Sequence, residues 1–470
     1  MLVVGGGITG VTAAYHLAAA GASVVVLESG RIASGTTGHS TGNLYSTVDG
    51  WLYHVREKWG DEVTAAVVES RRETVEGIAA LVDQHGIRCG FARRPHYIAA
   101  TESSHVEELA RERDALRAAG IAVEEATLPL PLPAVAAIRL EDQAQFHPAA
   151  YTCGLAAAVD DAHCRIFEDS PVLEIDETNL TARTPRGSVR AKKIILATHT
   201  PKGFNLIQTE LGPYREYAVA AELRDETSPE GIFWTMADET HSIRPYVHEG
   251  RRYLIVVGEF HKTGQHDPAR DYFASVDRFA RSRFDLGGTV WRWSAQQYRS
   301  ADHLPYIGKT ASSGDIFIAT GFGTDGLVYG SLAGRLLAAD IAGTPAPRGE
   351  MFRATRFAPA KAARSFAEEN VNVAKQYVKD YLTKALVVPL EEIPPGQGGI
   401  VEIDGEKTAV VRGADGSLTR LSPVCTHLGC LVHWNPMETS WDCPCHGSRF
   451  AADGAVLEGP AIRPLQAREP

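Results

Sequence analysis

The chain has 470 residues, of which 44% are hydrophobic and 22% are charged, and its formal net charge is −11. This length predicts two or three domains, and the ordinary composition excludes a disordered or low-complexity protein. Because the negative charge is spread along the chain and no apolar run could span a bilayer, we expect neither nucleic-acid binding nor a membrane span. The first residues have the pattern of a strand instead of a signal peptide, which favours a cytoplasmic protein.

The N-terminal segment has the pattern of a strand–turn–helix–strand unit. Leu2–Val4 is a short apolar strand that leads into a Gly-x-Gly-x-x-Gly turn and a helical pattern. A second apolar strand, Val24–Leu27, is followed by an acid. In such a unit the glycines allow a pyrophosphate to approach the backbone, the helix N-terminus faces its negative charge, and the acid binds a ribose diol. The pattern therefore predicts a dinucleotide site formed by Gly5, Gly7, Gly10 and Glu28.

Three later segments favour FAD over NAD as the dinucleotide. Ile194–Thr198 is a buried strand that ends in small residues, where a cofactor can lie close to the backbone. Asp302–Gly308 is rich in turn residues, and Ile316–Gly326 is a strand followed by a glycine loop and a helix. The N–H groups at the start of that helix could stabilise the electron-rich edge of a reduced flavin.

Together with Ser34–Gly42, these segments resemble the D-amino-acid oxidase family of FAD-dependent amine oxidoreductases over about residues 1–345. The resemblance implies an α/β Rossmann-like FAD domain and an α+β substrate domain that covers the flavin. The FAD domain would comprise about 1–80, 145–205 and 295–345, and the substrate domain about 80–145 and 205–295. The strand-like runs Tyr214–Leu223 and Tyr253–Gly258 fit the substrate domain. Further cofactor contacts that the resemblance implies are Thr36, Thr37, His39, Thr41, Val172, Ala197, Thr198, Gly321, Gly323 and Gly326.

The family oxidises C–N bonds by hydride transfer to flavin, so the resemblance implies a small amine or amino acid as substrate. Because an arginine can clamp a carboxylate, Arg244 is a candidate substrate ligand, and Tyr246, Tyr217 and Tyr214 are candidates to face the substrate. Thr36–His39 resembles the stretch of sarcosine and dimethylglycine dehydrogenases in which a histidine bonds covalently to flavin. His39 is therefore expected either to carry the flavin covalently or only to line its site.

The C-terminal part of the chain has a different pattern. Residues 346–387 are expected to form a helical linker, and their periodicity from about residue 350 predicts a pair of helices. Residues 388–470 contain short alternating runs, which predict a small all-β domain. Its hairpin turns are predicted at Asp404-Gly405, Asp415-Gly416 and Asp453-Gly454.

Two Cys–His pairs in this β domain could hold a metal centre. Cys425 and His427 are separated by one residue, and Cys443 and His446 by two. The pairs could bind zinc or a Rieske [2Fe–2S] cluster, and their spacing favours the cluster. The segments strongly resemble the Rieske proteins of cytochrome bc complexes. This implies that the four residues ligate a cluster and that Cys430 and Cys445 form a disulfide.

The Rieske resemblance extends to residues around the cluster. Ser448 matches a hydroxyl that hydrogen-bonds a bridging sulfide, and Gly459-Pro460-Ala461 resembles the proline loop that covers the cluster. Phe450 stands where high-potential members have a tyrosine that hydrogen-bonds a ligand sulfur. Because hydrogen bonds to sulfur stabilise the reduced cluster, Phe450 predicts a potential below the respiratory range.

A flavin accepts two electrons and a Rieske cluster carries one, so the two halves together suggest a dehydrogenase. We expect FAD to oxidise the C–N bond of a small amine or amino acid and the cluster to pass the electrons to an unknown external acceptor. The sequence leaves two alternatives open. The cluster could feed electrons to flavin for a reduction or hydroxylation, or the chain could be a non-catalytic redox or electron-transfer module.

Overall fold

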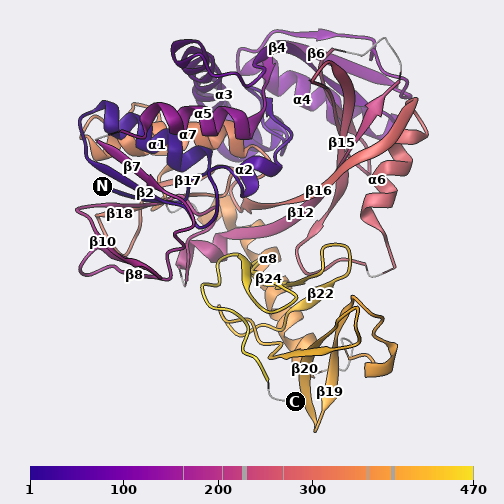
Figure 1. Cartoon of the computed structure of the whole chain (residues 1–470). Coiled ribbons are helices and arrows are strands. Elements are labelled where there is room, and N and C mark those ends of the chain that lie inside the picture. Colours follow the sequence, from indigo (N-terminus) through magenta and orange to yellow (C-terminus); the bar gives the residue numbers. More distant parts are fainter. Residues whose placement is uncertain are drawn as a thin grey trace.

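The structure is a computed structural model that describes residues 1–468 except 162, 204, 225–229, 268, 357–358 and 383–386. Within the expected helical linker, residues 357–358 and 383–386 therefore lie outside the described residues. Figure 1 shows an α/β part and a sheet part next to each other, with a small β part below them that contains the C-terminal end. Within the described residues, no helix is both long and apolar enough to cross a membrane.

The α/β part is built on a six-stranded sheet of the described chain, in the order β17–β18–β11–β1–β2–β7. All neighbours pair in parallel except the edge strand β17. Helices α1, α5 and α7 cover one face (Figure 1), and a three-stranded sheet, β8–β10, packs on the other. Burial on both faces explains the continuous apolar runs of the strands. The strand bounds are β1 Leu2–Val4, β2 Val24–Leu27, β7 Cys164–Phe167, β8 Glu174–Asp176, β9 Thr181–Thr184, β10 Gly187–Arg190, β11 Ile194–Leu196, β17 Tyr306–Lys309 and β18 Ile316–Thr320; the helix bounds are α1 Ile8–Ala19, α2 Thr36–His39, α3 Leu52–His85, α5 Pro148–Val159 and α7 Gly326–Ile341.

The sheet part is a second, larger sheet in the order β16–β12–β15–β14–β13–β4–β6–β3, with β5 beside β6. One face packs on α6, and the strands β12 and β15 contain the two strand-like runs that the sequence predicted. The bounds are β3 Asn43–Leu44, β4 Ala92–Ala100, β5 Val123–Glu125, β6 Ala136–Gln145, β12 Leu211–Leu223, β13 Ile232–Met236, β14 Ser242–His248, β15 Arg251–Lys262, β16 Leu286–Ser300, α4 Val106–Ala118 and α6 Tyr272–Arg281. The expected fold class, an α/β domain with a sheet-based second domain, is confirmed.

The C-terminal part contains two small antiparallel sheets, β19–β20–β21 and β22–β23–β24–β25. The first predicted hairpin is present because Asp404 and Gly405 have φ of 52° and 80°, as a two-residue type I′ turn requires. The bounds are β19 Gly398–Ile403, β20 Glu406–Arg412, β21 Leu418–Leu421, β22 His433–Asn435, β23 Ser440–Asp442, β24 Arg449–Ala451 and β25 Val456–Glu458. The expected small all-β domain is confirmed.

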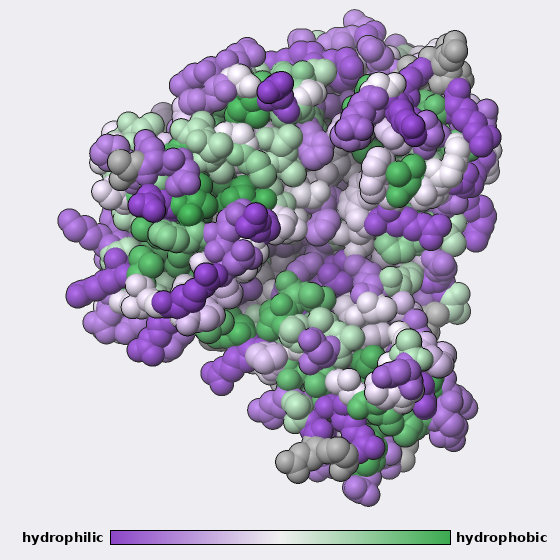
Figure 2. All heavy atoms as spheres, in the orientation of Figure 1, coloured by the Kyte–Doolittle hydropathy of each residue, from purple (hydrophilic) through white to green (hydrophobic). Residues whose placement is uncertain are grey.

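The predicted helix pair before this domain is wrong in its number of helices. A short 3₁₀ turn (Gly349–Phe352) precedes one long helix, α8 (Pro359–Leu382). No glycine or proline interrupts residues 360–382, so nothing in the sequence ends a first helix there. Figure 1 shows α8 running from the upper parts into the C-terminal part, and Figure 2 shows apolar side chains gathered where these parts meet.

Candidate active site and metal centre

A large cavity lies where the three parts meet. Its volume is about 1280 Å³, which exceeds the range of ~300–1,000 Å³ usual for small-ligand sites and leaves room for a dinucleotide and a small substrate. The α/β part contributes the N-terminal glycine turn and α2, and the sheet part contributes β12, β15 and β16. The C-terminal domain contributes Arg449, Leu457, Glu458 and Gly459.

The glycine turn has the geometry of a phosphate cradle. Gly5 has φ of 110°, and a Cβ on it would overlap the carbonyl oxygen of Ala197 in the neighbouring strand. A Cβ on Gly10 would overlap the carbonyl oxygen of Gly5, so only glycine lets α1 approach the turn. Glu28 accepts hydrogen bonds from the backbone N–H groups of Gly6 (2.6 Å) and Gly30 (2.8 Å). Its carboxylate is thereby held at the end of β2, on the cavity wall.

The structure brings together nearly all the cofactor contacts that the sequence predicted. Twelve of them line the cavity: Gly5, Gly7, Glu28, Thr36, Thr37, His39, Thr41, Ala197, Thr198, Gly321, Gly323 and Gly326. Gly10 serves the packing of α1 and does not reach the cavity. Val172 is not part of the cavity wall, and its side chain packs against the core cluster that contains Leu2 and Val4.

The three predicted substrate residues do not face the cavity. On β12 the side chains of Tyr214 and Glu216 point into the cavity, so Tyr217 points to the opposite face of the pleated strand. There its ring stacks on the ring of Tyr272, with 5.1 Å between the ring centroids. Arg244 is 4% exposed and donates to the backbone oxygens of Thr41 and Phe146.

Tyr246, on the same strand as Arg244, also lies off the cavity wall. Its ring is adjacent to those of His147 and His248, with centroids 6.1 Å away in both cases. Tyr214, the other tyrosine considered, does line the cavity and donates to Glu369 at 2.7 Å. Arg244 therefore braces the loop at Thr41 and is not part of the cavity wall.

Several cavity residues were missed by the sequence reasoning. Asp49, Glu216, Gln297, Arg299 and Tyr298 all line it. The alternation along β12 would have grouped Glu216 with Tyr214, but nothing local shows which face of a strand meets the cavity. The contributions of the C-terminal domain carry no sequence signal, because they depend on how two domains pack.

The four predicted cluster ligands lie together on two loops of the C-terminal domain. Cys425 and Cys443 are each 2% exposed and make no disulfide, and the rings of His427 and His446 lie 5.1 Å apart at 84°. The Nδ1 atoms of both imidazoles are buried and have no hydrogen-bond partner among the described residues. Burial lowers the pKa of both histidines to about 4, which keeps the imidazoles neutral and able to bind metal. This donor set fits a Rieske cluster.

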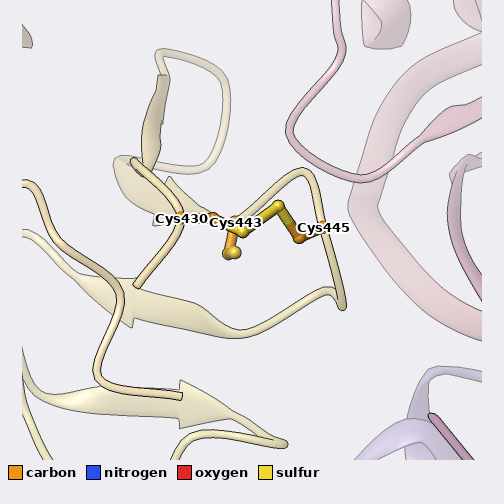
Figure 3. Close-up of side chains that lie close together, drawn as sticks. All are labelled: Cys430, Cys443 and Cys445. Carbon is orange, nitrogen blue, oxygen red and sulfur yellow. A yellow bond between two sulfur atoms is a disulfide. The ribbon is translucent and has the colours of Figure 1, made fainter. Parts of the chain in front are cut away.

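A disulfide joins the two loops beside these residues. Cys430 and Cys445 are bonded with an S–S distance of 2.11 Å, as the resemblance predicted. Figure 3 shows this bond next to the thiol of Cys443. The sulfur atoms of Cys430, Cys443 and Cys445 lie within 4.8 Å of one another, but the two that form the disulfide are unavailable as thiolate ligands. The disulfide thus leaves Cys425 and Cys443 as the free thiols of the two loops.

The surroundings of the candidate cluster site match the expected pattern in part. Ser448 Oγ accepts a hydrogen bond from Ala461 N (3.0 Å), so the hydroxyl proton remains free for a sulfur. Phe450 is fully buried in the core of the domain, with Cys425 and Cys443 in the same cluster. The carbonyl oxygen of Pro460 accepts from Gly203 N at 2.9 Å, which ties the proline loop to the α/β part.

The C-terminal domain is fixed against the other parts through the candidate ligands themselves. His427 Nε2 lies 3.0 Å from Gln208 Oε1, and Gln208 donates to the carbonyl oxygen of Pro201 at 2.8 Å. The hydroxyl of Tyr298 hydrogen-bonds the carbonyl oxygens of Gly459 (3.0 Å) and His446 (3.3 Å). Tyr298 also lines the cavity, so a single side chain separates the cavity from the backbone of a candidate ligand.

Comparisons with known proteins agree with this geometry. A family model described as FAD dependent oxidoreductase matches residues 1–340, and one described as Rieske [2Fe-2S] domain matches residues 383–469. YhfW of Bacillus subtilis, whose name describes a Rieske 2Fe-2S iron-sulfur protein, is 31% identical over 470 residues, which cover 99% of this chain and 92% of YhfW. The cytochrome b6-f complex iron-sulfur subunit of Chlorobaculum tepidum is 44% identical over 80 residues, 17% of this chain and 44% of that subunit.

Solved structures resemble the upper two parts. Glycine oxidase from Geobacillus kaustophilus and L-proline dehydrogenase from P. horikoshii each superpose with a TM-score of 0.63 at 19% identity, covering 76% of this chain and 98% and 96% of theirs. At this identity the likeness concerns the fold. The Rieske match decides between the zinc and iron–sulfur interpretations of the Cys–His pairs. The chain therefore belongs to the D-amino-acid oxidase family of FAD-dependent oxidoreductases and carries a Rieske [2Fe–2S] domain at its C-terminal end.

Proposed function

We propose that the protein oxidises a C–N bond of a small amine or amino acid with FAD, and that a Rieske cluster held by Cys425, His427, Cys443 and His446 passes the electrons to an external acceptor. The observation that carries this proposal is the shared cavity. Residues of the Rieske domain form part of the wall of the cavity that contains the dinucleotide glycines. The names of glycine oxidase and L-proline dehydrogenase support an amino acid or related amine as substrate class.

The residues of the chain have three tasks in this reaction. FAD, when bound, supplies the hydride acceptor, and the substrate loses a C–H electron pair as its C=N bond forms. The glycine turn and Glu28 bind the dinucleotide, and the cavity wall of β12 and β16 orients the substrate. Tyr298 and Gln208 hold the backbone of His446 and the ring of His427 in a fixed position relative to the cavity.

Anaerobic mixing with amines and amino acids tests the proposal. We expect the flavin absorbance to bleach first and the cluster to become reduced afterwards, as followed by visible absorbance and EPR. Cluster reduction before flavin reduction would favour the reverse electron flow. Absence of bleaching with every amine and amino acid would favour a non-catalytic redox module.

The hypothesis of covalent flavin attachment concerns His39 at the end of α2. Its ring lines the cavity, and its carbonyl oxygen accepts a hydrogen bond from Trp293 Nε1 at 2.7 Å, which fixes the end of the helix. The hypothesis predicts that acid precipitation leaves the flavin in the pellet and that His39→Ala moves all of it to the supernatant. Flavin in the supernatant of the unmodified protein would leave His39 as a residue that only lines the site.

The reduction potential of the cluster is predicted to lie below the respiratory range. Phe450 cannot donate a hydrogen bond to a ligand sulfur, so we expect a value well below the upper end of about +300 mV for Rieske centres but above about −400 mV of plant-type ferredoxins. Phe450→Tyr adds only a hydroxyl, and one hydrogen bond of about 1 kcal/mol should raise the potential by roughly 40 mV. An EPR-monitored redox titration measures both values. A respiratory-range potential in the unmodified protein would contradict the argument.

A further inference from the structure

The sheet side of the cavity is acidic. Carboxylates from separate elements reach this wall, among them Asp49 before α3, Glu216 on β12, Glu239 before β14 and Glu259 on β15. Carboxylates in a partly closed cavity raise the local concentration of cations. A substrate that carried a carboxylate would need a cation on the same wall.

The arginines on this wall are already engaged by carboxylates. Arg270 forms ion pairs with Glu239 at 2.6 Å and with Glu259 at 2.8 Å. Arg299 lies 3.3 Å from Asp49 and donates through Nε to Gln297. Lys202 also lines the cavity, next to Gly459 of the Rieske domain; burial lowers the pKa of its ammonium group, and Glu458 and Glu28 act in the opposite direction. The wall therefore offers a carboxylate ligand no arginine that is free of an ion pair among the described residues.

Glu216, unlike these arginines, has no ion-pair partner of opposite charge among the described residues. Its side chain faces the cavity and forms no ion pair with any residue that the structure describes. Burial and the nearby charge of Asp49 raise the pKa of Glu216 to about 8. Next to it, the side chain of Gln297 is 4% exposed and hydrogen-bonds Glu216. A half-buried carboxyl group that no cation neutralises favours its protonated form, and a bound cation would favour the charged carboxylate.

We infer that the substrate is a protonated amine without a carboxylate group, and that Glu216 binds its ammonium group. This inference rests on the proposed amine oxidation and names its substrate class. The ammonium group loses its proton to the Glu216 carboxylate, which frees the nitrogen lone pair. With FAD bound, the adjacent C–H bond would break, its hydrogen and electron pair would pass to the flavin, and the nitrogen lone pair would form the C=N bond of an iminium product.

Paired compounds that differ only in the carboxylate test the inference on the unmodified holoprotein. The pairs are pyrrolidine and proline, dimethylamine and sarcosine, and benzylamine and phenylglycine, each mixed anaerobically with the protein. We expect the amine of at least one pair to bleach the flavin at a concentration about tenfold or more below that of its amino acid. Preferential reduction by the amino acids would overturn the inference and leave the proposed function intact. Failure of all six compounds and of a wider amine and amino-acid screen would overturn both.

A charge-neutral variant tests the role of Glu216. Glu216→Gln keeps the shape of the side chain but loses the charge, and it should raise the amine concentration for half-reduction by about 10- to 100-fold. Glu125→Gln removes one charge from a side chain that is 78% exposed on β5, and it should change nothing. The flavin spectrum confirms that each variant is folded and loaded. If Glu216→Gln does not load flavin, Glu216→Asp takes its place, because it keeps the charge and should still bind the amine more tightly than the matching amino acid. The role of Glu216 is overturned if Glu216→Gln needs no more amine for half-reduction than the unmodified protein. It is also overturned if Glu216→Asp loses the preference for the amine.

Discussion

Replacing Cys425 with serine is expected to abolish the Rieske EPR signal and turnover with external one-electron acceptors, while anaerobic reduction of the flavin by substrate persists. Cys425 is a free thiol with 2% exposure, and it is one of only two thiol ligands proposed for the cluster. Changes in residues that only support metal ligands cost about 10–100-fold, so loss of a ligand should lower turnover by more than about 100-fold. Visible and EPR spectra and steady-state assays measure the three effects.

Cys153→Ser is the matched control for this variant. Cys153 is also a free thiol, but it is exposed and lies in α5, outside the Rieske domain. We expect the control to retain the EPR signal and turnover. If Cys425→Ser kept full turnover with every acceptor, electrons would not pass through the cluster, and the proposed route would be refuted.

Gly10→Ala is expected to remove FAD from the protein. The added Cβ would overlap the carbonyl oxygen of Gly5, so either α1 or the glycine turn must move away from the position that cradles a pyrophosphate. Overpacking of this kind costs about 1–3 kcal/mol in stability, and displacement of the turn should cost most of the flavin content. The ratio of flavin to protein after gel filtration and the thermal unfolding midpoint measure the two effects.

Gly77→Ala serves as the control because Gly77 also lies inside a helix, α3, and a Cβ there meets no atom within 4 Å. Alanine in place of a helical glycine should raise stability by about 0.5–1 kcal/mol and leave flavin content unchanged. A Gly10→Ala variant with full flavin content would show that the close approach of α1 to Gly5 is not needed for FAD binding.

The packing of the Rieske domain bears on how electrons would reach it. Arg215 of β12 is 1% exposed and forms an ion pair with Glu438 of the Rieske domain at 2.6 Å. This ion pair joins the domain to the sheet part, and removing one of its two partners should cost about 3–5 kcal/mol because the other charge would stay buried and unpaired. With Gln208 on His427 and Tyr298 on the backbone of His446, the domain is held in place close to the cavity. The proposed electron transfer therefore needs no movement of the Rieske domain.

The sequence by itself determined the features that depend on neighbouring residues. The glycine turn, Glu28 and the two Cys–His pairs are recognised from short motifs, because the residue types and spacings within each motif are already typical of its chemistry. The Asp404-Gly405 hairpin follows from the same local logic, since only two residues must adopt positive φ. The helical linker was recognised as helical, but the number of helices was wrong.

Only the tertiary structure decided which side chains face the cavity. Tyr217 and Arg244 were chosen by residue type, but a strand turns alternate side chains to opposite faces, and its local sequence does not say which face meets the cofactor. Glu216 emerged as the candidate substrate ligand for that reason. The entry of Glu458 into the cavity wall and the contact of Gln208 with His427 join residues more than 200 positions apart, and such contacts arise from domain packing, which no local pattern encodes.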